Sequence, residues 1–207
     1  MVQYDRFPAL LLGLTVLVCV VTGYAPVAGH TSWLLEVGPG LAGIAILLVT
    51  YRRFPFSHWV YACVFLHLLV LVYGGFYTYA LTPLGNWARD AFGLARNHYD
   101  RVGHLALGVF PAFVVREILL RLTPLRRGGW LYFLVCCVVL AIGAFWELLE
   151  WWTTLIVAAD VGDAFLGSQG DPWDAQWDMF LALVGAALAQ PLLGRFHDAS
   201  MANVPPG

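Results

Sequence analysis

Six long apolar runs constrain this chain more than any other feature. Each approaches the length of about 20 residues that an α-helix needs to cross a hydrocarbon core about 30 Å thick. Because lipid offers no hydrogen-bond partner to the backbone, such runs cross a membrane as helices. We therefore predict an all-α polytopic membrane bundle of about six transmembrane helices, at about Phe7–Tyr24, Trp33–Tyr51, His58–Leu81, Tyr99–Leu122, Trp130–Val157 and Trp177–Phe196.

The low charge content indicates the same class of protein. Of the 207 residues, 60% are hydrophobic and only 12% are charged, whereas a soluble domain carries about 25% charged residues. The net charge of −2 favours neither a nucleic-acid partner nor a polybasic lipid-binding surface. The four cysteines lie inside apolar runs and are expected to behave as small buried hydrophobes. We thus expect the lipid bilayer as a partner and no nucleic acid.

The arginines predict how the bundle is oriented. All 11 basic residues are arginines, and one group of them falls at alternate helix ends: Arg6, Arg52, Arg53, Arg121, Arg126, Arg127 and Arg195. The positive-inside rule then predicts both termini in the cytoplasm. The loop after the third run departs from this pattern. We interpret its arginines as ion-pair partners rather than topology signals, because Arg89, Arg96 and Arg101 stand among Asp90, His98 and Asp100.

The polar residues divide the chain unevenly. We treat residues 1–207 as a single integral membrane domain in which helices at about 7–81 form a scaffold and helices at about 99–196 carry a polar cluster. The cluster comes from three pairs at helical spacing: Asp100 with His104, Glu147 with Glu150, and Asp174 with Asp178. Residues three or four apart share a helix face.

Depth in the membrane predicts that the three pairs meet. In the predicted orientation, the fourth and sixth helices start at the outer face with their Asp/His and Asp/Asp pairs. The fifth helix rises from the cytoplasm, and Glu147 lies roughly 26 Å above Trp130 at about 1.5 Å per residue. All three pairs are therefore expected near the outer face, whereas the cytoplasmic half looks apolar.

Energetic cost makes a bound cation an attractive explanation for the cluster. A charged residue inside a membrane helix costs at least about 2.5–3.5 kcal/mol unless it faces a partner or water. Carboxylate and histidine ligands drawn from several helices are typical of carboxylate-bridged metal sites. They suit Mg, Mn, Fe or Zn without choosing among them. We predict a divalent metal held by ligands from Glu147, Glu150, Asp100, His104, Asp174 and Asp178.

Roles can be assigned within this hypothesis, and structural alternatives stay open. The predicted catalytic residues are Glu147, Glu150, His104 and Asp178, and the predicted substrate-binding residues are Arg96, Arg101, His98 and Asp171. Alternatively, His98 only caps the fourth helix, and Asp100, Asp174 and Asp178 only stabilise the helix N-termini near which they lie. The paired glutamates are harder to explain, because adjacent carboxylates repel without a cation or a shared proton. The remaining polar groups are expected to be structural: His30, Glu36, His58, His67 and His197.

At these residues the sequence resembles the YjdF-like family of bacterial inner-membrane proteins, a domain of unknown function. The resemblance is sharpest in Asn97–His104, Trp146–Trp151, and Gln169–Asp174 with Asp178-Met179. The order Asp-x-x-x-His, Glu, Asp-x-x-x-Asp is more distantly similar to the VanZ-like membrane proteins, some of which are associated with glycopeptide resistance. The resemblance implies a multi-pass protein of the bacterial inner membrane and no established reaction.

Three functions remain open from the sequence. The first is a membrane-embedded enzyme, with or without a metal ion, that acts on a lipid or isoprenoid-linked envelope substrate. The second is a proton- or cation-coupled transporter, although no internal repeat or polar path is evident. The third is a non-catalytic envelope assembly or resistance factor whose polar cluster only holds helices together.

Overall fold

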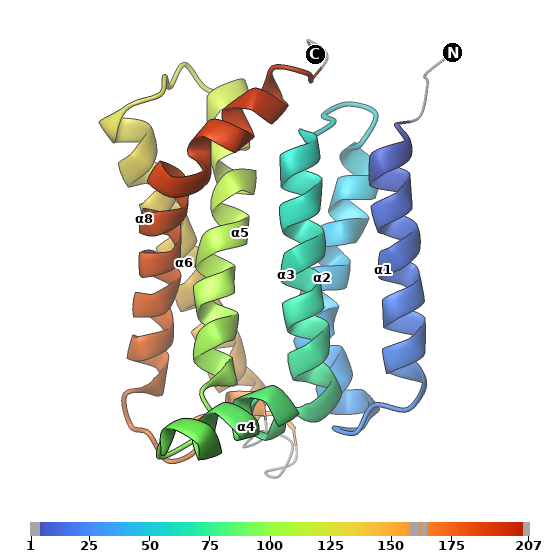
Figure 1. The fold of residues 1–207 in the computed structure, drawn as a ribbon, viewed down its shortest axis with the longest axis vertical. Coiled ribbons are helices and arrows are strands. Elements are labelled where there is room, and N and C mark those ends of the chain that lie inside the picture. Colours follow the sequence, from blue (N-terminus) through green and yellow to red (C-terminus); the bar gives the residue numbers. More distant parts are fainter. Residues whose placement is uncertain (1–4, 158–161, 163–164, 205–207) are drawn as a thin grey trace.

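The computed structural model describes residues 5–157, 162 and 165–204 and has the all-α architecture that the sequence predicts (Figure 1). No strand occurs in these residues. The six apolar runs all become helices, and the fourth matches its predicted bounds. The elements are α1 (Arg6–Tyr24), α2 (His30–Thr50), α3 (His58–Tyr77), the short 3₁₀ turn η1 (Tyr79–Leu81), α4 (Pro83–Phe92), α5 (Tyr99–Leu122), α6 (Gly129–Thr154) and α8 (Asp174–Met201).

Five of these helices, α1, α2, α3, α6 and α8, are long and apolar enough to cross a membrane. The chain is therefore a multi-pass membrane bundle. α5 has a comparable length of 24 residues, but charged residues near both of its ends make it less apolar. It packs against α3, α6 and α8, so those charges meet other helices. A sixth crossing by α5 stays a prediction, and so does the cytoplasmic location of the termini.

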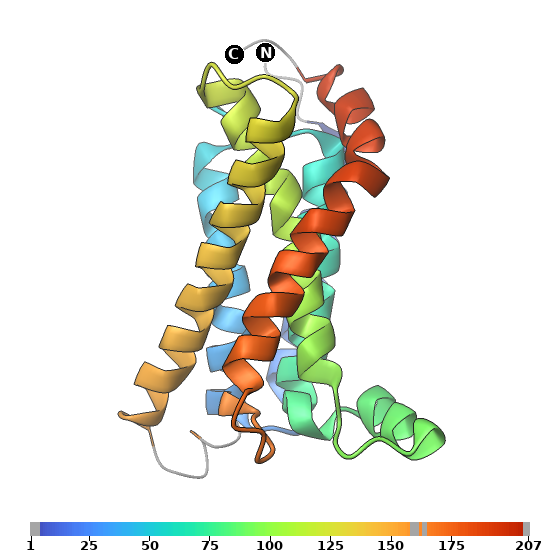
Figure 2. The same ribbon diagram turned by 90° about the vertical axis from the view of Figure 1, so that its left-hand side faces the viewer.

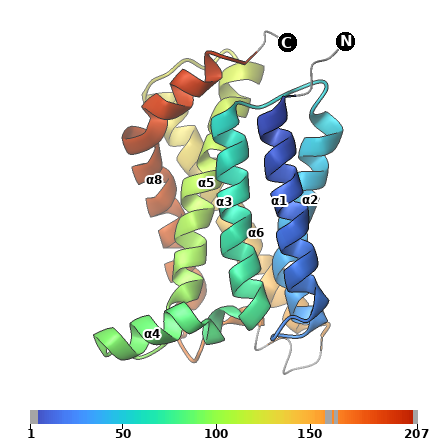
Figure 3. The ribbon, with the colours of Figure 1, turned by 45° about the vertical axis from the view of Figure 1, so that its right-hand side comes forward.

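The helices form two neighbouring groups, α1–α3 and α5, α6 and α8, which meet where α3 contacts α5 (Figures 1 and 3). α1 begins and α8 ends at the same end of the bundle (Figure 1), as the predicted orientation requires. We call this the terminal end and the opposite one the cluster end. α8 contains Pro191, and its last part turns away from the rest of the helix (Figure 2), as expected where proline removes a helix hydrogen bond.

Small residues let α5 and α8 approach closely. A Cβ atom added to Gly108 would lie 2.2 Å from the carbonyl oxygen of Ala182, and one added to Gly185 would lie 2.4 Å from that of Leu105. α6 joins the contact at Gly143, where an added Cβ would lie 3.2 Å from that of Ala182. Such small-residue seams are typical of membrane helix packing. The seam lies two to three turns into α5 and α8 and so holds their first turns near each other.

A buried polar network joins α3, α5 and α8 at the terminal end. Glu117 and His197 are both fully buried. Glu117 accepts hydrogen bonds from the backbone N–H of Ser57 at 2.9 Å, its hydroxyl at 2.6 Å and Arg121 at 2.8 Å. Arg116 donates to His197 Nδ1 at 2.8 Å, which leaves Nε2 to donate to Glu117 at 3.0 Å. The expectation that this half is apolar was wrong, although His197 does have the structural surroundings expected of it.

Helix α4 was not predicted and lies across the cluster end (Figures 1 and 2). Pro83 stands in its first turn, and Gly93 ends it with a left-handed φ of 63°, the usual proline and glycine positions at helix ends. Leu84, Trp87 and Phe92 are exposed. A short helix with an exposed apolar side lies naturally in the plane of a membrane interface.

Candidate functional site

Three helices bring five ionisable side chains together at the cluster end. His104 of α5 lies at the centre, with Nε2 3.4 Å from Glu147 Oε1 of α6 and 3.7 Å from Asp100 Oδ1 of its own helix. Asp100, His104 and Asp178 of α8 each offer a ligand atom within 4.8 Å of the other two, and so do His104, Glu147 and Glu150. We call these five residues the carboxylate–histidine cluster.

The cluster is buried, and several of its polar atoms have no partner. Relative exposure is 4% for His104, 4% for Glu150 and 2% for Asp178. Among the described residues, His104 Nδ1, Glu147 Oε1 and Asp178 Oδ1 are buried without a hydrogen bond. Glu150 has one donor, the indole N–H of Trp146 at 2.6 Å. Because buried polar atoms are nearly always hydrogen-bonded, these three atoms leave room for a bond to water, a ligand or an ion.

The donor set fits a divalent cation. Ligand atoms at about 2.0–2.2 Å from one ion lie no more than about 4.4 Å apart, so the two groups need only a small closure of their side chains. His104 belongs to both groups, so an ion can combine it with carboxylates from α5 and α8 or from α6. Carboxylates with one imidazole suit Mg, Mn, Fe or Zn. A cation also offsets the repulsion among the carboxylates.

Asp174, also predicted as a ligand, faces a different partner. Arg96 donates to Asp174 at 2.5 Å, and both side chains are 9% exposed. Arg96 also donates to the carbonyl oxygen of Ser168. Asp174 belongs to neither group of ligand atoms described above. Its pairing ties the start of α8 to the segment that precedes α5.

The other predicted substrate-binding residues lie beside this pair, and we call Arg96, His98, Arg101 and Asp171 the rim of the cluster. Arg101 donates to Asp171 at 2.5 Å, and its guanidinium lies 5.3 Å from the ring centre of Trp177. Arg96 also approaches Asp171, at 3.9 Å. The interpretation of Arg96 and Arg101 as ion-pair partners is therefore confirmed. Their partners do not come from the same loop, however, because Asp171 precedes α8 and Asp174 begins it.

Two of the rim residues lie outside the spanning segments and have shifted pKa values. The backbone N–H of Trp173, followed by Arg101 and Arg96, holds the pKa of Asp171 below its usual range, so its carboxylate stays charged. Partial burial and then the same two arginines lower the pKa of His98, which is neutral at pH 7. The rim thus consists of matched charges and one neutral imidazole.

Asn97 holds the rim in place, a role that the sequence did not predict. Its Oδ1 accepts from the backbone N–H of Tyr99 at 3.0 Å and caps α5. Its Nδ2 donates to the carbonyl oxygen of Thr82 at 3.1 Å, and its backbone bonds to the Gln169 side chain at 3.2 and 2.8 Å. His98 stands at the N-cap position of α5, as one interpretation expects, but its side chain makes no capping bond.

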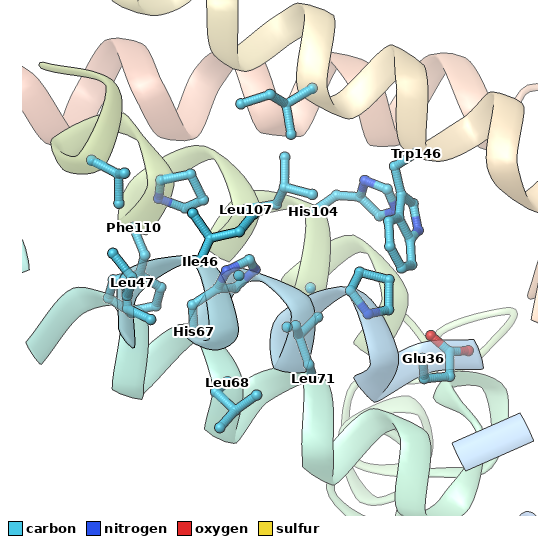
Figure 4. A pocket seen from close by; sticks show the side chains of 18 of the residues that line it. Glu36, Ile46, Leu47, His67, Leu68, Leu71, His104, Leu107, Phe110 and Trp146 are labelled. Carbon is cyan, nitrogen blue, oxygen red and sulfur yellow. The ribbon is translucent and has the colours of Figure 1, made fainter. Parts of the chain in front are cut away.

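A cavity of about 700 Å³ opens from the cluster between α2, α3, α5 and α6. Asp100, His104 and Glu150 line its polar end together with Glu36 of α2, which is 4% exposed. Figure 4 shows Glu36 and His104 toward one end and Leu47 and Phe110 toward the other. Glu36, expected to be structural, thus lines the polar end of the cavity. The cost of a carboxylate inside an apolar run, which singled out the α6 glutamates, applied equally to it.

Comparison with known proteins agrees with this architecture. The family model described as "Predicted membrane protein (DUF2238)" matches residues 7–199. The chain belongs to the DUF2238 family. It is 46% identical over 176 residues, 84% of each chain, to the inner membrane protein YjdF of Escherichia coli K12. Like that relative, this DUF2238 member is a multi-pass inner-membrane protein. No solved structure matches the chain, and these matches add nothing to the VanZ-like resemblance.

Proposed function

We propose that this protein is a membrane-embedded, metal-dependent enzyme acting on a lipid-linked envelope substrate at the outer membrane face. One observation carries the proposal: the cluster holds three buried polar atoms without hydrogen bonds, and its residues Asp100, His104 and Glu150 line the polar end of a largely apolar cavity. A buried group of this kind in a membrane marks a functional site by default. The outer-face location follows from the predicted orientation.

The residues take distinct roles in this proposal. Asp100, His104 and Asp178, or His104 with the two α6 glutamates, hold the cation. When bound, the ion polarises a phosphoryl or acyl oxygen of the substrate. Where the ion lies between α5 and α8, Glu147 serves as the general base, because its Oε1 lies 3.4 Å from His104 Nε2 without a hydrogen bond and can accept a proton from an attacking water.

The rim residues bind the polar part of the substrate. Arg96 and Arg101 carry the fork-shaped guanidinium that pairs with phosphate oxygens. Each is now bonded to an aspartate, so phosphate binding requires exchange of one aspartate contact for a substrate contact. His98 and Asp171 stand beside them, the former as a neutral donor and acceptor and the latter as the carboxylate that positions Arg101.

Metal content tests the proposal directly. Purified protein is dialysed against Mg, Mn, Fe or Zn, and bound metal per chain is measured by mass spectrometry. We expect about one equivalent in the wild type and a loss in His104→Ala, because His104 belongs to both groups of ligand atoms; Asp178→Asn also loses it where the ion lies between α5 and α8. Asp90→Asn is the matched control, because Asp90 is an exposed carboxylate at the same end. Wild type no richer in metal than both site variants would contradict the proposal.

A non-catalytic assembly factor is the second candidate, favoured by the ion pairs that tie the start of α8 to the α5 region. In that case Glu147→Gln leaves the envelope phenotype of a deletion strain fully complemented, whereas Arg96→Ala, which unpairs buried Asp174, destabilises the protein. The enzyme proposal requires the reverse for Glu147→Gln: a folded protein that fails to complement.

The transporter alternative predicts that Glu150→Gln abolishes cation or proton flux in proteoliposomes.

A further inference from the structure

The cavity extends far beyond the cluster. On α2 its lining residues run from Glu36 to Thr50, and on α5 from Asp100 to Leu122. At about 1.5 Å per residue these stretches cover roughly 21 and 33 Å. Half of a hydrocarbon core about 30 Å thick is only about 15 Å. The space therefore continues past the middle of the membrane toward the terminal end.

The walls change character along this length. At the cluster end they carry carboxylates and an imidazole, as described above. Beyond it they are mostly aliphatic and aromatic, with Leu71, Leu107, Phe110 and Leu47 among the lining residues, and His67 of α3 is a polar side chain within this stretch (Figure 4). The cavity thus has the polarity of an amphiphile, with one polar end and a long apolar body.

Shape and access also favour a chain. Spread over roughly 21–33 Å, the volume of about 700 Å³ gives a mean cross-section of only roughly 21–33 Å². That is space for a chain rather than for a folded ring system. α2 packs against α3, and α6 packs against α5 and α8, whereas α2 and α6 form no comparable contact across the described residues. The side between α2 and α6 is therefore where we place the entry of a lipid chain.

We propose that this cavity binds a single polyprenyl chain, with its phosphate head at the carboxylate–histidine cluster. A phospholipid acyl chain in the outer leaflet ends near the membrane midplane, whereas this cavity continues beyond it, which favours the longer isoprenoid chain. The placement of the anionic head rests on the proposed function, because an acidic cluster accepts phosphate only through a bound cation. Binding of the chain itself does not depend on that cation.

Gly43 provides a specific test. It lines the cavity about halfway between Glu36 and Thr50, and a Cβ added there meets nothing within 4 Å. Gly43→Phe therefore fills the cavity without a clash at its own Cβ. Gly13→Phe on α1 is the matched control, because Gly13 is exposed, lines neither described cavity and is equally open at its Cβ.

Binding is measured by native mass spectrometry on the full-length protein in detergent, with undecaprenyl phosphate, uncharged undecaprenol, geranyl phosphate and phosphatidylglycerol as probes. We expect Gly43→Phe to weaken binding of both undecaprenyl lipids by at least about tenfold, because the part of the chain beyond Gly43, toward the terminal end, loses its apolar contacts. Geranyl phosphate should bind unchanged, because its short chain stays between the cluster and Gly43. Gly13→Phe should match wild type with all four probes.

The outcomes separate this inference from the proposed function. Undecaprenol binding that Gly43→Phe leaves intact overturns the inference, and so does phosphatidylglycerol binding as tightly as undecaprenyl phosphate. A third outcome is that the protein holds no metal but binds undecaprenol, and that Gly43→Phe blocks this binding. That outcome supports the proposed chain-binding cavity and overturns only the proposed metal-dependent enzyme. Gly43→Leu repeats the test with a smaller side chain if the phenylalanine variant does not fold.

Discussion

The seam between α5 and α8 gives the sharpest test of how the fold builds the site. Gly185 of α8 lies so close to α5 that an added Cβ would stand 2.4 Å from the carbonyl oxygen of Leu105 and 2.9 Å from Cα of Gly108. Both contacts are to backbone, which cannot rotate aside. Gly194, farther along the same helix, is also buried, but nothing lies within 4 Å of its added Cβ.

The two glycines therefore predict opposite signs for the same substitution. In a helix, Gly→Ala stabilises by about 1 kcal/mol through backbone entropy. At Gly185 the added methyl also forces α5 and α8 apart, and overpacking of this kind costs about 1–3 kcal/mol, with backbone contacts at the upper end. Gly185→Ala should thus destabilise the protein by about 1–2 kcal/mol, whereas Gly194→Ala should stabilise it by up to about 1 kcal/mol.

The assay is reversible unfolding in mixed micelles with increasing sodium dodecyl sulfate, followed by tryptophan fluorescence. Metal content is measured on the same samples, because separation of α5 from α8 draws Asp178 away from His104 and should reduce any metal held between them. Equal stability of the two alanine variants, or a Gly185→Ala protein more stable than wild type, would refute the close crossing and the argument that it positions the site.

Three further predictions test other parts of the structure. Asn97→Ala removes the α5 cap and leaves the Thr82 carbonyl without its donor, so chemical denaturation should show a loss of about 1–3 kcal/mol. Glu117→Ala strips several buried donors of their acceptor and should cost about 3–5 kcal/mol, read from the same titration. Asp171 has a lowered pKa, so its pairing with Arg101 stabilises the fold fully above the ordinary aspartate pKa. This stabilisation is lost as pH falls through the lowered pKa. The melting temperature of the wild type should therefore fall more at acid pH than that of Asp171→Asn.

Apolar run length predicted the helices well, because the thickness of the membrane fixes how many residues each must contain. The α5 bounds were exact, and α6 differed by a few residues. α4 was missed because its 10 residues are too few for an apolar run that crosses a membrane, although Pro83 and Gly93 mark its ends. α8 begins earlier than its apolar run, at Asp174, because ion pairing with Arg96 lets a charged first turn stay helical and buried.

The site was predicted in part, for a reason that lies in tertiary packing. Spacing of three and four placed each ionisable pair on one helix face, and depth placed the three pairs at one level. Which faces meet depends on glycines such as Gly108 and Gly185, whose contacts no helix shows by itself. Glu36 reaches the cavity for a similar reason: an added Cβ at Gly75 of α3 would lie 2.8 Å from Glu36 Cβ, so α2 packs closely there.

The two ends of the bundle show how differently this chain treats buried carboxylates. At the terminal end, Glu117 is fully buried and every donor around it comes from the protein: Ser57 twice, Arg121 and His197. At the cluster end, Asp178 is 2% exposed, yet its Oδ1 has no partner among the described residues. A buried carboxylate that only joins helices stabilises the fold best when its oxygens accept hydrogen bonds from the protein, as those of Glu117 do. The unsaturated cluster carries a desolvation cost that a structural role does not require, and a bound cation and substrate would offset it.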